Sequence, residues 1–252
     1  MKQQTYYFLC LLARSAAFLF LVVWALARPE SFDAGLGLAD AFRFTPTTAV
    51  WLLLMASMVL RLFPSQVESI GSQKEFRRRF RPTGRQPDPR EIRRADRGAL
   101  GVLALWAVFN AVFYAAYLGG IVDLRFLVCL AGFYGVCDII CILFFCPFQA
   151  WIMHNRCCTT CRIYDWDYLM LCTPLFLVPG IPAQSACILS GVIFLRWEIT
   201  YLRRRERFFE SSNEALGCAR CQGHLCRYKR AIAGSVKPPA PSPGPENGGC
   251  RP

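Results

Sequence analysis

Two apolar stretches in the middle of the chain, ALGVLALWAVFNAVFYAAYLG (99–119) and FLVCLAGFYGVCDIICILFFCPF (126–148), decide the fold class. Each matches the roughly 20 residues that an α-helix needs to cross the hydrocarbon core of a bilayer. Asp138 is the only charged residue in either stretch, whereas a soluble domain spreads polar residues along every segment. A helix satisfies its own backbone hydrogen bonds in lipid, so both stretches predict membrane-spanning helices.

Two apolar runs nearer the N-terminus, residues 6–27 and 47–63, predict further spans. The first run also has features of a signal peptide, because Lys2 precedes it and small residues form a cleavage pattern at 25–27. We expect it to remain as an anchor, because further spans follow. Both alternatives place Arg28 and the residues after it on the outer side of the membrane, so both predict the same topology for the rest of the chain.

The last apolar region, residues 168–196, is interrupted by Pro174, Pro179, Gly180 and Pro182. Proline inside a helix removes a hydrogen bond and clashes with the preceding turn. We therefore predict a short Pro/Gly-interrupted hairpin of two spans that turns at 179–182. The expected fold is an all-α integral membrane protein with about six transmembrane helices.

The charge of the loops predicts their sides, because cytoplasmic loops carry an excess of Lys and Arg. The segment 61–97 has eleven basic and five acidic residues, whereas the segment 28–46 has two basic and three acidic. The basic segment is therefore expected in the cytoplasm. Residues 203–205 are all Arg, which favours a cytoplasmic tail and an even number of crossings between 167 and 203. Both termini are then cytoplasmic in a multi-pass protein of the cell membrane.

These spans and loops predict five regions. They are the first two transmembrane helices (1–64), a basic cytoplasmic loop (65–97), a transmembrane bundle (98–202) with a cytoplasmic Cys loop (149–167), a basic Cys-rich tail (203–230), and a final segment (231–252). The final segment is rich in Pro, Gly and Ser, so it cannot bury a core and is predicted to be disordered.

Two cysteine clusters lie on the predicted cytoplasmic face: NRCCTTCR (155–162) and CARCQGHLC (218–226). Each contains a Cys-x-x-Cys pair, and two such pairs can supply four thiolates in a tetrahedron. That arrangement suits zinc or an iron–sulfur cluster. Cysteines clustered in a reducing compartment are more often metal ligands or redox groups than disulfides. The candidate metal ligands are Cys157, Cys158, Cys161, Cys218, Cys221, Cys226 and His224.

Other roles for these thiols stay open. Cysteines close to the inner leaflet are acceptors for palmitoylation, and clustered thiols also carry out redox chemistry. A third alternative is that they have no specific role, because cysteine also serves as a small hydrophobe in the apolar runs of this chain. His224 or His154 could replace a thiolate ligand.

Part of the chain resembles a group of uncharacterised bacterial polytopic membrane proteins with Cys-rich cytoplasmic motifs. The resembling pieces are CPFQ (146–149), residues 155–164 and residues 216–230, together 29 of the 252 residues. The resemblance implies that the two cysteine clusters belong together. It implies no activity, substrate or cofactor.

Arg14, Asn110 and Asp138 are polar residues within the predicted spans. An ionisable residue inside a span is a functional hypothesis by default. At 1.5 Å of rise per residue, Arg14 and Asp138 differ in depth by roughly 4–5 Å, so an ion pair between them is feasible. Such a pair could hold the bundle together, or the polar side chains could line a path for a proton or an ion.

The sequence leaves three functions to compare. The first is a metalloprotein with an iron–sulfur or zinc centre, used in membrane-associated electron transfer or as a structural clamp. The second is a small-solute or ion carrier that uses Asp138 and Asn110. The third is a non-catalytic membrane subunit that docks a soluble cytoplasmic partner through its basic loop.

The expected partners are the lipid bilayer itself and anionic lipids at the basic loop, to which each Lys or Arg near the surface contributes about 1 kcal/mol. Nucleic acid is not expected, because the chain has no recognisable nucleic-acid-binding module. No Walker A loop, dinucleotide fingerprint, zincin motif or nucleophile elbow occurs. Whether the protein is an enzyme therefore stays open.

Overall fold

The computed structural model describes residues 3–34, 46–64, 72–77, 80–155 and 157–217. In this part of the chain all regular structure is helical, and the one β-bridge, between Pro82 and Asn213, is isolated. The α-helices are α1 (Gln3–Ala27), α2 (Pro29–Ala34), α3 (Pro46–Arg61), α4 (Ser72–Glu75), α5 (Pro89–Leu118), α6 (Leu124–Leu143), α7 (Asp167–Cys172) and α8 (Ile181–Arg203).

Shorter helical segments link these α-helices, most of them at one end of the bundle. A π-helix, η3 (Phe148–Met153), follows α6, and the 3₁₀ turns η4 (Cys158–Thr160) and η5 (Tyr164–Trp166) lead into α7. The 3₁₀ segment η6 (Thr173–Leu177) continues α7, and η7 (Arg205–Arg207) and η8 (Glu214–Leu216) follow α8. We call this the Cys-loop end, because η3, η4 and the cysteines between 146 and 161 lie there.

Among the described residues, four helices are long and apolar enough to cross a membrane: Thr5–Ala27, Pro89–Leu118, Leu124–Leu143 and Ile181–Arg203. Large apolar side chains such as Leu12, Val108 and Leu195 are more than half exposed on their outer surfaces, as lipid-facing residues are. The predicted all-α fold of membrane class agrees with these helices. Thr47–Arg61 is apolar but shorter, so the count of six spans stays a prediction.

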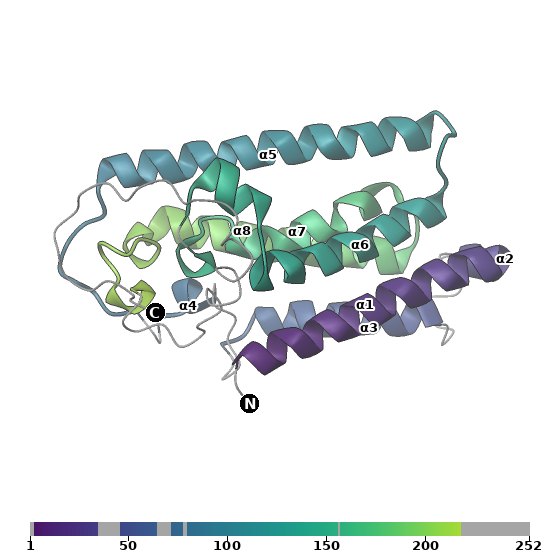
Figure 1. Ribbon diagram of the computed structural model, residues 1–252, viewed down its shortest axis with the longest axis horizontal. Helices are drawn as coiled ribbons and strands as arrows, with labels where there is room; N and C mark the ends of the chain where they lie inside the picture. Colours follow the sequence, from purple (N-terminus) through teal and green to yellow (C-terminus); the bar gives the residue numbers. More distant parts are fainter. Residues whose placement is uncertain (1–2, 35–45, 65–71, 78–79, 156, 218–252) are drawn as a thin grey trace.

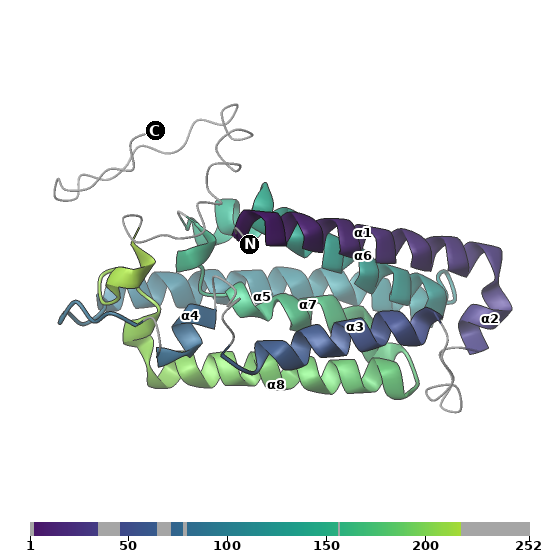
Figure 2. The same ribbon diagram turned by 90° about the horizontal axis from the view of Figure 1, so that it is seen from below.

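The long helices lie in three layers (Figure 1). On one side of α6, α7 and α8 lies α5, and on the other lie α1 and α3. Helix α1 packs along α6, α3 packs along α8, and α7 contacts both α6 and α8. Figure 2 shows α7 between the two pairs, with α1 and α3 on separate sides of it.

The local sequence determines where α5 and α6 begin. Asp88 caps α5 by accepting a hydrogen bond from the Arg90 N–H at 2.8 Å, and Pro89 occupies the first turn, where proline is tolerated. Asp123 caps α6 through the Phe126 N–H at 2.9 Å. The last nine residues of the predicted basic loop are therefore the first turns of α5 rather than irregular chain.

The region 168–196 differs in part from the two short spans predicted for it. The chain turns at Val178–Gly180, close to the predicted position, and Gly180 has φ +106°, a conformation that glycine adopts readily. The first arm, α7 with η6, is short and breaks at Pro174, but α8 is a full helix of 23 residues. Pro182 lies in its first turn, where it interrupts no hydrogen bond.

Candidate metal-binding loop and intramembrane cavity

The first cysteine cluster lies on a tight turn. Helix η3 ends at His154, which is left-handed with φ +49°, and the chain then reverses through η4. The Cys161 N–H donates to the Cys158 carbonyl at 3.1 Å, and the Thr160 N–H donates to the Cys157 carbonyl at 3.3 Å. The turn thus brings the two ends of the Cys158-x-x-Cys161 pair together.

Gln149 contacts one thiol of this turn and one thiol before it. Its side-chain oxygen accepts from Cys158 Sγ at 3.6 Å, and its backbone N–H donates to Cys146 Sγ at 3.4 Å. Cys161 is buried, and burial raises the pKa of its thiol, with Lys74 opposing the shift. A raised pKa means that Cys161 holds its proton unless a metal or a cation displaces it.

Lys74 is fully buried beside this turn, and sequence reasoning missed it. Its Nζ donates to the Cys161 carbonyl at 2.7 Å and lies 5.7 Å from the ring centres of both Trp197 and Phe208. Burial lowers the pKa of Lys74 to about 8. The one signal in the sequence is that Lys74 is the only lysine in a basic segment otherwise built of arginine.

An ion-pair network fastens the helices that surround the turn. Arg61, at the end of α3, bonds Asp165 at 2.6 Å and Asp167 at 2.8 Å. Burial raises the pKa of Asp165 to about 6, while Arg61 opposes that shift. Arg196 on α8 bonds Glu75 at 3.1 Å. The ends of α3, α4, α7 and α8 are therefore joined by charged groups.

A second part of the network centres on Arg162, which follows Cys161 directly. Its guanidinium bonds both carboxylate oxygens of Glu198 and lies 3.5 Å from the ring centre of Tyr201. Trp166 also donates to Glu198, at 2.7 Å. The arginine that flanks the first cluster is thus committed to a structural pair with α8.

The structure places the chain that leads to the second cluster, but not the cluster itself. Phe208 packs against Trp197 and Tyr201 in the same core as Cys161. Asn213 caps η8, and Leu216 is buried. The predicted ligands Cys218, Cys221, Cys226 and His224 lie outside the described residues. Within the described ranges, no group of three His, Cys, Asp or Glu residues is placed to hold a metal ion.

The ion pair predicted between Arg14 and Asp138 is present. Arg14 NH1 lies 2.7 Å from Asp138 Oδ2 and 2.9 Å from the Gly135 carbonyl. Asn110 lies elsewhere: its side chain donates to the Trp106 carbonyl at 2.9 Å and accepts from the Tyr134 hydroxyl at 3.2 Å. The depth along each helix axis predicted the pair, whereas Asn110 forms a separate contact between α5 and α6.

A cavity of about 740 Å³ lies between α1 and α3, with α6, α7 and α8 behind it. Its lining is mostly apolar, and it includes Arg14 and Asp138 but not Asn110. Tyr6, Ser57 and Arg61 add polar groups nearer the Cys-loop end. This size and this mixture of a largely apolar wall with few polar groups are typical of small-molecule sites.

Comparison with known proteins gives no further guide. No family model, no curated protein and no solved structure matches the chain. The function must therefore be argued from the residues themselves.

Proposed function

We propose that the chain is a multi-pass membrane protein whose two cysteine clusters bind one metal centre at the cytoplasmic face. The observation that carries this proposal is the position of the chain before the second cluster. Phe208 lies in the hydrophobic core that contains Cys161. The segment from Phe208 to Gly217 is held to Arg81, because the Arg81 N–H donates to Asn213 Oδ1 at 3.2 Å and the Glu214 N–H donates to the Arg81 carbonyl at 2.9 Å. Cys218 follows directly, so little additional loop entropy opposes closing the ligand set.

The proposed ligands are Cys158 and Cys161 from the turn, with Cys218 and Cys221 from the tail. Cys157, Cys226, Cys146 and His224 are the proposed replacements for these ligands. Four thiolates suit zinc or an iron–sulfur cluster. An iron–sulfur cluster would serve electron transfer at the membrane, and zinc would clamp the tail to the bundle.

The proposed topology has six crossings: α1, α3, α5, α6, the α7–η6 segment and α8. The α7–η6 arm is too short to span a bilayer of ordinary thickness on its own. It would complete the crossing together with the turn at Val178–Gly180, at a place where the bilayer is locally thinner. Reporter fusions after Thr160 and Gly217 should then report the cytoplasm, and a fusion after Asp123 should report the outside. Opposite reports from Thr160 and Gly217 would place the two clusters on different faces and refute the shared site.

Metal analysis of protein purified without oxygen tests the centre directly. We expect near-stoichiometric iron with visible absorbance that is lost in air, or near-stoichiometric zinc without colour. Cys158→Ser and Cys218→Ser should each release the metal, because serine is a poor substitute for a thiolate ligand. Cys129→Ser, in α6 and far along the chain from either cluster, is the control and should retain it. Protein with neither iron nor zinc would refute the proposal.

The cavity between α1 and α3 favours a second candidate function, the binding or passage of a small solute through the membrane. Asp138 and Arg14 line it together with Ser57 and Arg61 of α3, and Asn110 does not, so the polar path would run along α1, α3 and α6. Asp138→Asn should then abolish uptake or binding in proteoliposomes while the metal content is unchanged. This readout separates the second function from the first.

A further inference from the structure

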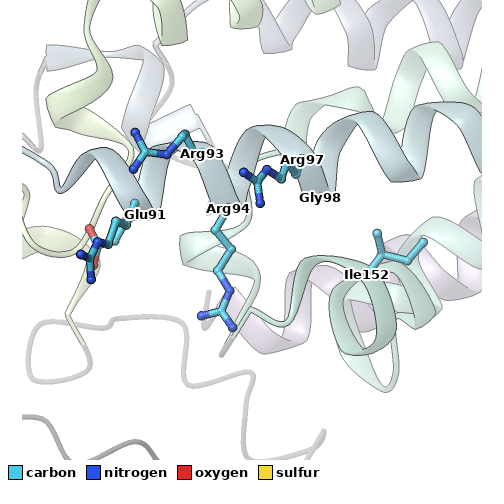
Figure 3. Close-up of a pocket in the computed structure, with 7 residues that line it drawn as sticks. Glu91, Arg93, Arg94, Arg97, Gly98 and Ile152 are labelled. Carbon is cyan, nitrogen blue, oxygen red and sulfur yellow. The ribbon is translucent and has the colours of Figure 1, made fainter.

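The N-terminal turns of α5 carry a row of arginines on one face. Arg90, Arg93, Arg94 and Arg97 follow the spacing i, i+3, i+4 and i+7, which places side chains along one side of a helix. Together with Glu91, Gly98 and Ile152 they line a hollow of about 640 Å³ (Figure 3). We call this hollow the arginine hollow.

The arginines of the hollow differ from three less exposed arginines at this end of the bundle, Arg61, Arg162 and Arg196, each of which bonds a carboxylate. In the part of the chain that the structure describes, none of the four guanidinium groups of the hollow forms an ion pair or a hydrogen bond. The single carboxylate of the hollow, Glu91, accepts a hydrogen bond from the Ser211 hydroxyl at 2.8 Å. Four guanidinium groups and one carboxylate leave a net charge of +3.

The hollow lies at the level of the lipid headgroups along the membrane normal. The apolar part of α5 begins directly after Gly98, and Leu100 is 66% exposed. Arg97 therefore lies at the edge of the hydrocarbon, and Arg90 lies about 10 Å further out at 1.5 Å per residue. The headgroup layer on each side of a bilayer is about 5–8 Å thick. Arg94 and Arg97 thus lie at the level of the phosphates and Arg93 at the outer edge of the layer, whereas Arg90 lies a few ångströms beyond it.

The floor of the hollow is apolar and belongs to another element. Helix η3 packs against α5 and brings Ile152 into the lining (Figure 3). Small residues on α5 permit this approach: a Cβ at Gly98 would lie 2.7 Å from Met153 Sδ, and a Cβ at Gly101 would lie 3.2 Å from Ile152 Cγ2. Next to Ile152, Trp151 is 71% exposed, as suits a residue at a membrane interface.

We propose that the arginine hollow binds the headgroup of an anionic phospholipid with two phosphate charges, of the cardiolipin type. Guanidinium groups bind phosphate oxygens in pairs, and a net +3 matches two phosphates better than one. The apolar floor would take the glycerol and the first carbons of the acyl chains. The site rests on the membrane class of the fold and is independent of the proposed metal centre.

The test uses the full-length chain in detergent, titrated with cardiolipin or phosphatidylcholine and followed by native mass spectrometry. Each arginine near an anionic surface contributes roughly 1 kcal/mol, so the double variant Arg93→Gln with Arg94→Gln should bind cardiolipin about 30-fold more weakly. The matched control is Arg81→Gln with Arg85→Gln, two exposed arginines outside the hollow. We expect the control to bind cardiolipin within threefold of the parent.

Three outcomes would overturn the proposal. Equal losses in the two double variants would show a general attraction to charge rather than a site. Inorganic pyrophosphate that competes at the same concentration as cardiolipin would identify a free-phosphate site without a lipid. Tighter binding of an acidic peptide or an oligonucleotide than of cardiolipin, lost with Arg93 and Arg94, would identify a soluble partner instead.

Discussion

Breaking the Arg14–Asp138 pair should destabilise the bundle more than breaking a salt bridge on a water-exposed surface would. The perturbation is a double-mutant cycle with Arg14→Gln, Asp138→Asn and both together. Each single change leaves one charged group among apolar helices without its partner. The double change removes both charges of the pair, whose atoms lie 2.7 Å apart, and leaves two neutral amides in their place.

The structure sets the expected magnitude. The side chains of Arg14 and Asp138 are 26% and 17% exposed, and Arg14 also donates to the Gly135 carbonyl at 2.9 Å. A charge left in the middle of a span costs about 2.5–3.5 kcal/mol on insertion scales, and removing one partner of a buried pair costs about 3–5 kcal/mol. We therefore expect about 3 kcal/mol for each single variant and a coupling of about 2 kcal/mol in the double variant.

The assay is thermal or denaturant unfolding of the purified chain in one detergent, with each variant measured alongside the parent. The matched control is the pair between Asp123 and Arg125, which are 50% and 32% exposed at the start of α6. An exposed pair contributes about 0–1 kcal/mol, and Asn at position 123 retains the cap of α6. Asp123→Asn with Arg125→Gln should therefore show little coupling.

Strictly additive losses in the Arg14 and Asp138 cycle would refute the reasoning. The two side chains would then contribute independently, and the contact at 2.7 Å would carry no energy of its own. A single variant as stable as the parent would have the same consequence, because an unpaired charge in the span must cost free energy unless water reaches it. Water in the cavity would favour passage of a solute.

Three further predictions concern the rest of the structure. Burial raises the pKa of Glu75 from 4.5 to about 7, so ionisation of this carboxyl destabilises the fold as the pH rises through this window. The stability of Glu75→Gln relative to the parent should therefore increase by up to about 3 kcal/mol between pH 4.5 and 8. A stability difference that does not change with pH would contradict this. Arg162→Lys should lower stability by about 2 kcal/mol, because lysine cannot bond both oxygens of Glu198; Arg85→Lys is the control in the same unfolding assay. Asn110→Ala should cost about 1–2 kcal/mol by leaving its tyrosine partner without an acceptor and should leave any uptake unchanged.

The fold class and the Arg14–Asp138 pair could be predicted from the sequence because both depend on distance along a helix. The length of an apolar run and the depth of a residue follow from a rise of 1.5 Å per residue. Rotation about the axis is harder to read in α5 and α6, where apolar residues surround the helix. For this reason the sequence did not indicate that Asn110 bonds Tyr134 rather than facing the Asp138 cavity.

The buried charges at the Cys-loop end could not be predicted, because each depends on contacts between distant segments. Lys74 reaches the carbonyl of Cys161, and Glu75 reaches Arg196 on α8. Nothing in the basic segment 65–97 distinguishes these residues from exposed neighbours except the single lysine. The start of α5 could have been predicted from the sequence, because Asp88 is a suitable helix cap and Pro89 follows it in the first turn.

The buried network also bears on how the proposed metal centre would form. Lys74, Asp165 and Arg162 hold the turn of Cys158 and Cys161 through the backbone and through neighbours, not through the thiols. An unpaired charge at such buried positions costs several kcal/mol, so the turn keeps its place whether or not the thiols bind a metal. Half of the proposed ligand set would then be fixed in advance, and the proposed metal would add the tail after Gly217 to it. Chelation should therefore release the tail and leave the helical bundle folded, unlike a zinc finger, which unfolds when its metal is removed.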